Sequence, residues 1–174
     1  ATIALFEGDI AEGLQRYEAV LPVALRSSNR LHQIWAYTGF ASAFLRLGRH
    51  SEALVAAEQG RALSEENAER VTEISCLGVL AQAYLLLGEP EAARQRAAHA
   101  AALIAPSPTP TGSHAYQGYL YTALTFLALW EAAGPGERAA AAKAARQACG
   151  FMRTFARAFP YGQAGFELCE GLRA

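Results

Sequence analysis

Three glycines in this chain of 174 residues, Gly8, Gly48 and Gly88, follow one another at intervals of forty residues. The sequence around two of them also repeats, as ASAFLRLGRHSEAL at positions 41–54 and AQAYLLLGEPEAAR at positions 81–94. Self-similarity at a fixed period is the signature of a repeat architecture, in which each unit buries its apolar face against its neighbours. Because glycine suits the tight corner at a helix end, the spacing predicts helix-turn-helix units of about forty residues.

Apolar residues ahead of Gly48 and Gly88 recur at the i, i+3, i+4, i+7 spacing of one helix face. The two stripes are Tyr37, Phe40, Ala41 and Phe44, then Leu77, Leu80, Ala81 and Tyr84. Ala41 and Ala81 are predicted contact points, because a small residue lets two helices approach closely. The helices after the glycines carry matching small residues: Ala53, Ala57 and Gly60, then Ala93, Ala97 and Ala100. A third, altered copy is expected at ALTFL, with Ala123 and Phe126 in the repeat positions.

The composition favours an all-α fold. Hydrophobic residues make up 52% of the chain, and alanine dominates them, whereas the β-branched and aromatic residues of sheets are sparse over most of its length. We expect one domain of antiparallel helix pairs over residues 1–174. Its parts are a partial repeat at 1–29, repeats at 30–67 and 68–106, a longer repeat at 114–158, and the start of a further repeat at 164–174.

Both ends of this array are expected to lack a packing neighbour. Phe166, Leu168 and Leu172 recur at helical spacing near the end of the chain, which predicts an apolar face that a further repeat would cover. A second copy of the chain could cover the same face, so homo-oligomers through the terminal repeats are possible. We interpret the sequence as a segment of a longer protein.

Several classes of function are disfavoured by charge and spacing. The formal net charge of -1, from 15 basic and 16 acidic residues, offers no field for nucleic acid or an anionic membrane, and no apolar run is long enough to span one. His32, His50, His99 and His114 have no metal-ligand spacing, and neither a phosphate loop nor a nucleophile elbow is present. Cys76, Cys149 and Cys169 are widely spaced and are interpreted as inert core thiols. We therefore expect a cytoplasmic protein without catalysis, metal or cofactor.

Trp35 is the most prominent candidate for a binding residue. At 100° per residue it lies nearly opposite the Tyr37 to Phe44 stripe, with Ser42 on the same side and Ser75 and Gln82 equivalent one repeat later. A large aromatic among small polar residues is typical of an interaction groove. Packing of Trp35 on the preceding repeat, near Arg26, is an equally weighted alternative.

Two charged stretches are weaker candidates. The run SEENAERVTE at 64–73 could bind a cation or a basic peptide, but Glu66 and Arg70 have the spacing of a helical ion pair, which favours a solvated surface. Arg146, Arg153 and Arg157 share one helix face and could hold a carboxylate or phosphate, although a charged outer face is the simpler interpretation.

These motifs resemble the tetratricopeptide repeat family over roughly residues 8–104. The resemblance implies a right-handed superhelix of helix pairs, but the period of forty exceeds the family's usual period of about 34 residues. The stretch RQACGFMRTFARAFPYGQAGFELCEGL at 146–172 is similar to the repeat tails of bacterial nucleotide-cyclase and signalling-ATPase regulators. The resemblance implies a non-catalytic scaffold that binds a protein, a peptide or other domains of the same chain. The alternative is a domain that senses a small molecule or peptide in its concave groove.

Overall fold

The computed structural model describes residues 4–5 and 8–174, and every regular element in these ranges is a helix. The α-helices are α2 (Ile10–Arg26), α3 (Arg30–Arg46), α4 (His50–Glu66), α5 (Arg70–Leu86), α6 (Pro90–Ile104), α7 (Tyr116–Glu131), α8 (Arg138–Ala158) and α9 (Gln163–Arg173). Two short 3₁₀ helices, η1 (Ser113–Ala115) and η2 (Pro160–Gly162), precede α7 and α9. The predicted all-α class is confirmed.

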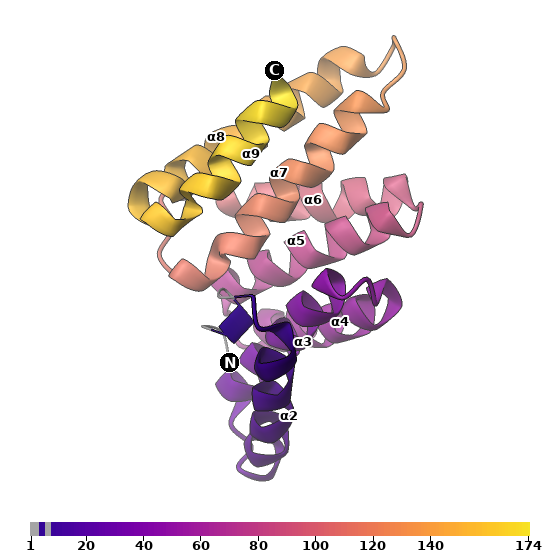
Figure 1. Ribbon diagram of the computed structural model, residues 1–174. Coiled ribbons are helices and arrows are strands. Elements are labelled where there is room, and N and C mark those ends of the chain that lie inside the picture. The colour runs from indigo at the N-terminus through magenta and orange to yellow at the C-terminus, as the bar shows by residue number, and fades with distance from the viewer. Residues whose placement is uncertain (1–3, 6–7) are drawn as a thin grey trace.

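The helices form a solenoid that rises from α2 and α3 at one end to α8 and α9 at the other (Figure 1). Helices α3, α5, α7 and α9 contact one another in that order and form one layer. A second layer contains α4, α6 and α8. Each of these helices packs against the helix before it and the helix after it in the chain, and α2 packs on α3. Each helix therefore covers the apolar face of its neighbours.

The corners between the first helices recur every twenty residues. Gly8, Ser28, Gly48, Ala68 and Gly88 all have positive φ, between 51° and 92°. At each corner the next residue donates its backbone N–H to a carbonyl five residues earlier, as from Arg49 to Phe44 at 2.9 Å. This hydrogen bond defines the Schellman motif, which requires a left-handed residue at that point. The predicted glycine corners are confirmed, and the same corner occurs midway between them.

The predicted small residues lie where helices meet. Ala41, Ala53, Ala81, Ala93 and Ala123 are fully buried. Their large companions fill the space alongside, with Phe126 buried and Tyr37, Phe44 and Tyr84 half-buried.

A pair of glycines brings the backbones of two helices into close contact. A β-carbon added to Gly78 of α5 would lie 2.7 Å from the Cα of Gly118 in α7. A β-carbon on Gly118 would in turn lie 2.6 Å from the backbone oxygen of Ile74. The backbones of α5 and α7 therefore touch, and α7 is drawn toward α3.

Replacing Ala68 by glycine is expected to stabilise the protein. A non-glycine residue in the left-handed region costs about 1–2 kcal/mol, part of which is offset by the greater freedom of glycine in the unfolded chain. We expect Ala68→Gly to raise the free energy of unfolding by about 0.5–1 kcal/mol in urea denaturation. Gly48→Ala, at a corner with open space around it, should lower the same quantity by about 1 kcal/mol. Equal stability of both variants and the parent would contradict the assigned corners.

The contact between α5 and α7 gives a second prediction. Gly78→Ala should lower the free energy of unfolding by about 1–3 kcal/mol, because the added methyl group meets backbone that cannot yield. The matched control is Gly150→Ala in α8, where nothing lies within 4 Å of the added carbon. It should gain about 0.5–1 kcal/mol from helix propensity. A stabilised Gly78→Ala variant would show that the two backbones do not touch.

Candidate functional site

A groove of about 700 Å³ lies on the concave side of the described part of the chain. One wall is α3 and the other is the segment from η1 into α7, with Thr72 of α5 between them and α2 at one end. The principal lining residues are Tyr17, His32, Trp35, Thr38, Ser42, Arg46, Thr72, His114, Tyr116, Gln117, Leu120 and Tyr121. We call this feature the α3–α7 groove.

The helical repeat of α3 aligns its part of the lining. Trp35, Thr38, Ser42 and Arg46 succeed one another at steps of three or four residues, so their side chains share one face. His32 and Arg46 are fourteen residues apart, which corresponds to about 21 Å of helix. The groove therefore follows α3 for most of its length.

A hydrogen bond crosses the groove between helices that are not neighbours in sequence. The Ser42 hydroxyl of α3 donates to the side-chain amide oxygen of Gln117 in α7 and shares its proton with the Thr38 carbonyl, which lies 2.9 Å away. The contact passes over α5, which offers no side chain at Gly78. Ser42 and Gln117 thus connect the two walls of the groove.

The groove is aromatic and carries little charge. Trp35 is 43% exposed and makes an edge-to-face contact with His32, the ring centroids lying 5.4 Å apart. Tyr17, Tyr116 and Tyr121 contribute further rings, and burial raises the pKa of the Tyr121 hydroxyl, so it stays protonated. Among the described lining residues none is Asp or Glu, and Arg46 supplies a cation whose guanidinium donates to the Leu5 carbonyl. This surface favours neutral or anionic ligands over cations.

Thr72 places a buried polar group at the groove. Its side chain is 1% exposed, and within the described structure its hydroxyl has no hydrogen-bond partner. An unpaired buried hydroxyl costs about 1–3 kcal/mol, so a ligand that offered a partner would recover free energy there.

The structure brings together two of the four residues predicted for the binding site, and their role in binding stays a prediction. Trp35 and Ser42 line the groove, but Ser75 and Gln82 do not. Ser75 is fully buried and donates to the His114 carbonyl at 2.9 Å, and Gln82 accepts a hydrogen bond from Thr125 at 3.3 Å. The close approach of α7 covers this part of α5, which corrects the prediction for both residues. The sequence analysis missed the polar lining residues Arg46, Thr72 and Gln117.

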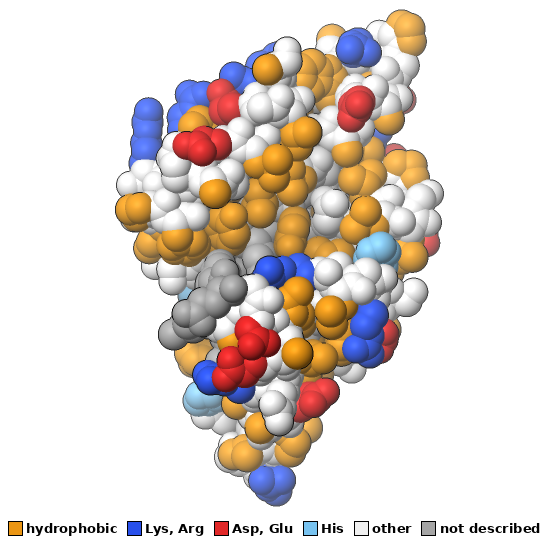
Figure 2. Space-filling model, in the orientation of Figure 1, with side chains coloured by type: hydrophobic (Ala, Val, Ile, Leu, Met, Phe, Trp, Pro, Cys, Tyr) orange, Lys and Arg blue, Asp and Glu red, His pale blue; other side chains and the backbone are white. Residues whose placement is uncertain are grey.

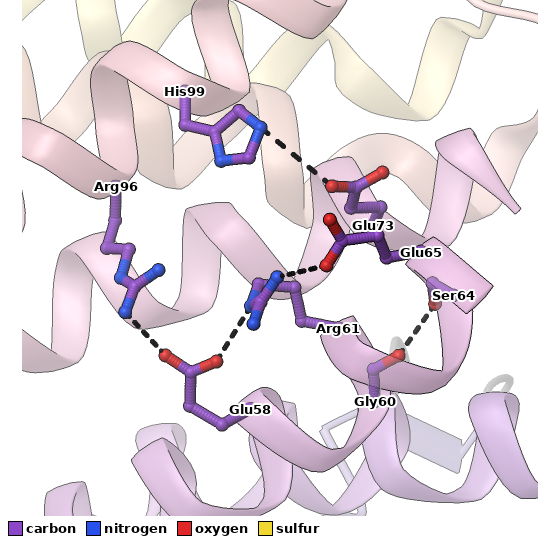
Figure 3. A network of polar contacts seen from close by, with 8 residues as sticks. All are labelled: Glu58, Gly60, Arg61, Ser64, Glu65, Glu73, Arg96 and His99. Atoms are coloured by element: carbon purple, nitrogen blue, oxygen red, sulfur yellow. Dashed lines mark hydrogen bonds and ion pairs between the residues drawn. The ribbon is translucent and has the colours of Figure 1, made fainter. Parts of the chain in front are cut away.

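Charged side chains of the 64–73 stretch and of the neighbouring helices make polar contacts between units. Glu66 and Arg70 lie on opposite sides of the corner at Ala68, so the predicted helical pair does not form, and Arg70 donates instead to the Leu103 carbonyl. Ion pairs link neighbouring units in Figure 3: Arg96 of α6 lies 2.7 Å from Glu58 of α4, which also binds Arg61 at 2.7 Å. His99 of α6 lies 3.9 Å from Glu73 of α5.

The described residues were also compared with the requirements of a metal site and of a membrane span. Within residues 4–5 and 8–174, no three His, Cys, Asp or Glu side chains are grouped as metal ligands. No helix in these ranges has the length and hydropathy needed to cross a bilayer.

Hydrophobic side chains are visible along α9 (Figure 2), where Leu168 and Leu172 are exposed. Phe166, the third residue of the predicted apolar face, is half-buried and packs against the core.

Comparison with known proteins supports the repeat interpretation for the first part of the chain. A family model described as tetratricopeptide repeat matches residues 1–66. Repeats of this kind generally mediate protein–protein interaction. Searches of curated proteins and of solved structures found no significant match.

The contact between Ser42 and Gln117 can be measured by a double-mutant cycle. Ser42→Ala and Gln117→Ala should show a coupling free energy of about 0.5–1.5 kcal/mol, because each removes the other's partner. Ser42→Ala combined with Thr125→Ala is the control, since Thr125 bonds to Gln82. Coupling below about 0.3 kcal/mol in the first pair would contradict a bridge across the groove.

Proposed function

We propose that the chain is a non-catalytic interaction module whose α3–α7 groove binds a short extended segment of a protein partner. The observation that carries the proposal is the exposed Trp35 ring at the edge of a groove that also offers polar groups. Aromatic anchors in concave, partly desolvated sites supply much of the binding free energy in protein interfaces.

The length of the groove suits a peptide. An extended chain advances about 3.3 Å per residue, so about 21 Å along α3 accommodates some six residues. The walls offer side-chain hydrogen-bonding groups at Thr72, Gln117 and Arg46, which peptide carbonyl groups or a carboxylate could use. The aromatic rings would contact apolar side chains of the bound segment.

A small-molecule sensor is the second candidate. The unpaired Thr72 hydroxyl and the bridge between Ser42 and Gln117 support it, because a ligand beneath the bridge would contact both walls. Such a ligand would favour one curvature of the solenoid over another and could pass that preference to an attached domain.

The wider setting is proposed from the sequence. Similarity of residues 146–172 to repeat tails of bacterial nucleotide-cyclase and signalling-ATPase regulators supports a role within a larger cytoplasmic regulator. Other domains of that protein are then possible partners of the groove. We also propose from the sequence that the chain divides into repeats at 30–67, 68–106 and 114–158. Self-association through α9 is a further proposal from the sequence.

Selection of peptides from a random phage-displayed library against the protein tests the leading proposal. Trp35→Ala should weaken binding of the selected peptides at least tenfold in titration calorimetry, as expected for an interface anchor. Val55→Ala is the control, because Val55 of α4 is 62% exposed and lies outside the groove. Melting temperatures of both variants verify folding.

Three outcomes separate the candidates. Peptides that require Trp35 but not Val55 support the scaffold. A compound that co-purifies with the parent and is lost from a Thr72→Val variant in native mass spectrometry supports the sensor. Peptide binding that survives Trp35→Ala and fails in Val55→Ala would place the interaction on the outer face and overturn the proposal.

A further inference from the structure

Helices α8 and α9 form an antiparallel hairpin with a defined register. Arg153 of α8 pairs with Glu170 of α9 at 3.6 Å, and its guanidinium lies over the Phe166 ring, 5.3 Å from the centroid. Farther along the hairpin, a β-carbon on Gly165 would lie 3.2 Å from Cε of Met152. The two helices run antiparallel, so a residue late in α8 faces a residue early in α9.

This register brings two of the three cysteines together. Cys149 lies three residues before Met152 on α8, and Cys169 lies four residues after Gly165 on α9, so both are on the facing sides of their helices. Both side chains belong to the same buried cluster and are at most 1% exposed. The register and the shared cluster therefore place the two thiols next to each other between α8 and α9.

The surroundings shift the pKa values of the two thiols in opposite directions. The hydrogen bond from Cys169, followed by the nearby positive charge of Arg173, lowers the pKa of Cys149. The same hydrogen bond, together with burial, raises the pKa of Cys169. The positive charges of Arg173 and Arg153 favour the thiolate of Cys149, which is the reactive form of a cysteine.

Cys76 provides a contrast within the same molecule. It lies in α5, where its nearest polar contact is the Thr38 hydroxyl at 3.4 Å, and burial raises its pKa to about 12. It therefore serves as an internal control of the same residue type and similar burial.

We propose that Cys149 and Cys169 form a modification site, a reversible disulfide between α8 and α9 that closes on oxidation by a hydroperoxide. The Cys149 thiolate attacks one peroxide oxygen, which breaks the O–O bond and gives a sulfenic acid with release of water or an alcohol. The Cys169 sulfur then displaces the sulfenic hydroxyl as water, and the S–S bond forms. Two thiols lose two protons and two electrons in total, and the peroxide is reduced to water, or to water and an alcohol.

Access to the buried pair requires α9 to open. This helix has 11 residues and exposes Leu168 and Leu172 on its outer side. Short elements with one exposed face open at a lower free energy than the core of a domain. Oxidation would then hold α9 on α8 and slow its amide exchange.

Treatment of the folded protein with hydrogen peroxide, followed by non-reducing peptide mapping in a mass spectrometer, tests this site. We expect one crosslinked peptide pair joining Cys149 to Cys169, the loss of two hydrogen atoms, and full reversal by dithiothreitol. Cys76 should stay a free thiol. Amide exchange in α9 should slow at least tenfold in the oxidised protein, with no change in α4.

Variants keep the test decisive. Cys76→Ala should crosslink as the parent does, whereas Cys149→Ala and Cys169→Ala should not. Cys149→Ser, which keeps a polar group of similar size, repeats the test if an alanine variant unfolds. Free methionine added to the buffer shows whether the peroxide is active. A parent protein that keeps both thiols while the free methionine is oxidised would overturn the proposal. A disulfide that includes Cys76 would overturn it as well.

Discussion

Contact between the backbones of α5 and α7 at Gly78 and Gly118 determines the shape of the concave face. Helix axes usually lie 8–10 Å apart because side chains separate them, and two facing glycines remove that separation. The contact lets Gln117 of α7 reach Ser42 of α3 across the intervening helix. The groove, its bridge and the burial of Ser75 all follow from this one approach.

The corners supply the second constraint, since five left-handed residues at intervals of twenty fix where the first helices begin and end. Three of the five are glycine, which adopts this conformation without steric cost, and Ser28 and Ala68 adopt it against their intrinsic preference. Ion pairs such as Arg96 with Glu58 then connect units at partly exposed positions, where each adds little to stability. The solenoid therefore depends on backbone geometry and close packing more than on charge.

The sequence was informative where local chemistry decides the structure. Glycine spacing and the stripe around Ala41 predicted the helix class and the corners, because left-handed turns and small contact residues leave a local pattern. The sequence could not reveal Ala68 as a corner, since alanine rarely takes that conformation. Nor could it show that α7 covers Ser75, or that Cys149 faces Cys169, because both depend on the register between helices. Trp35 was recognised because an exposed aromatic interrupts a polar face.

The most direct test of the groove as the binding surface is an NMR titration of the isotope-labelled protein with a peptide selected to bind it. The account predicts that the largest shift changes fall on the Trp35 indole N–H, the Gln117 side-chain amide and the backbone of α3. Amides of α4 and α6 on the opposite layer should hardly move. Shift changes centred on the exposed face of α4 around Val55, with the Trp35 indole unchanged, would contradict it.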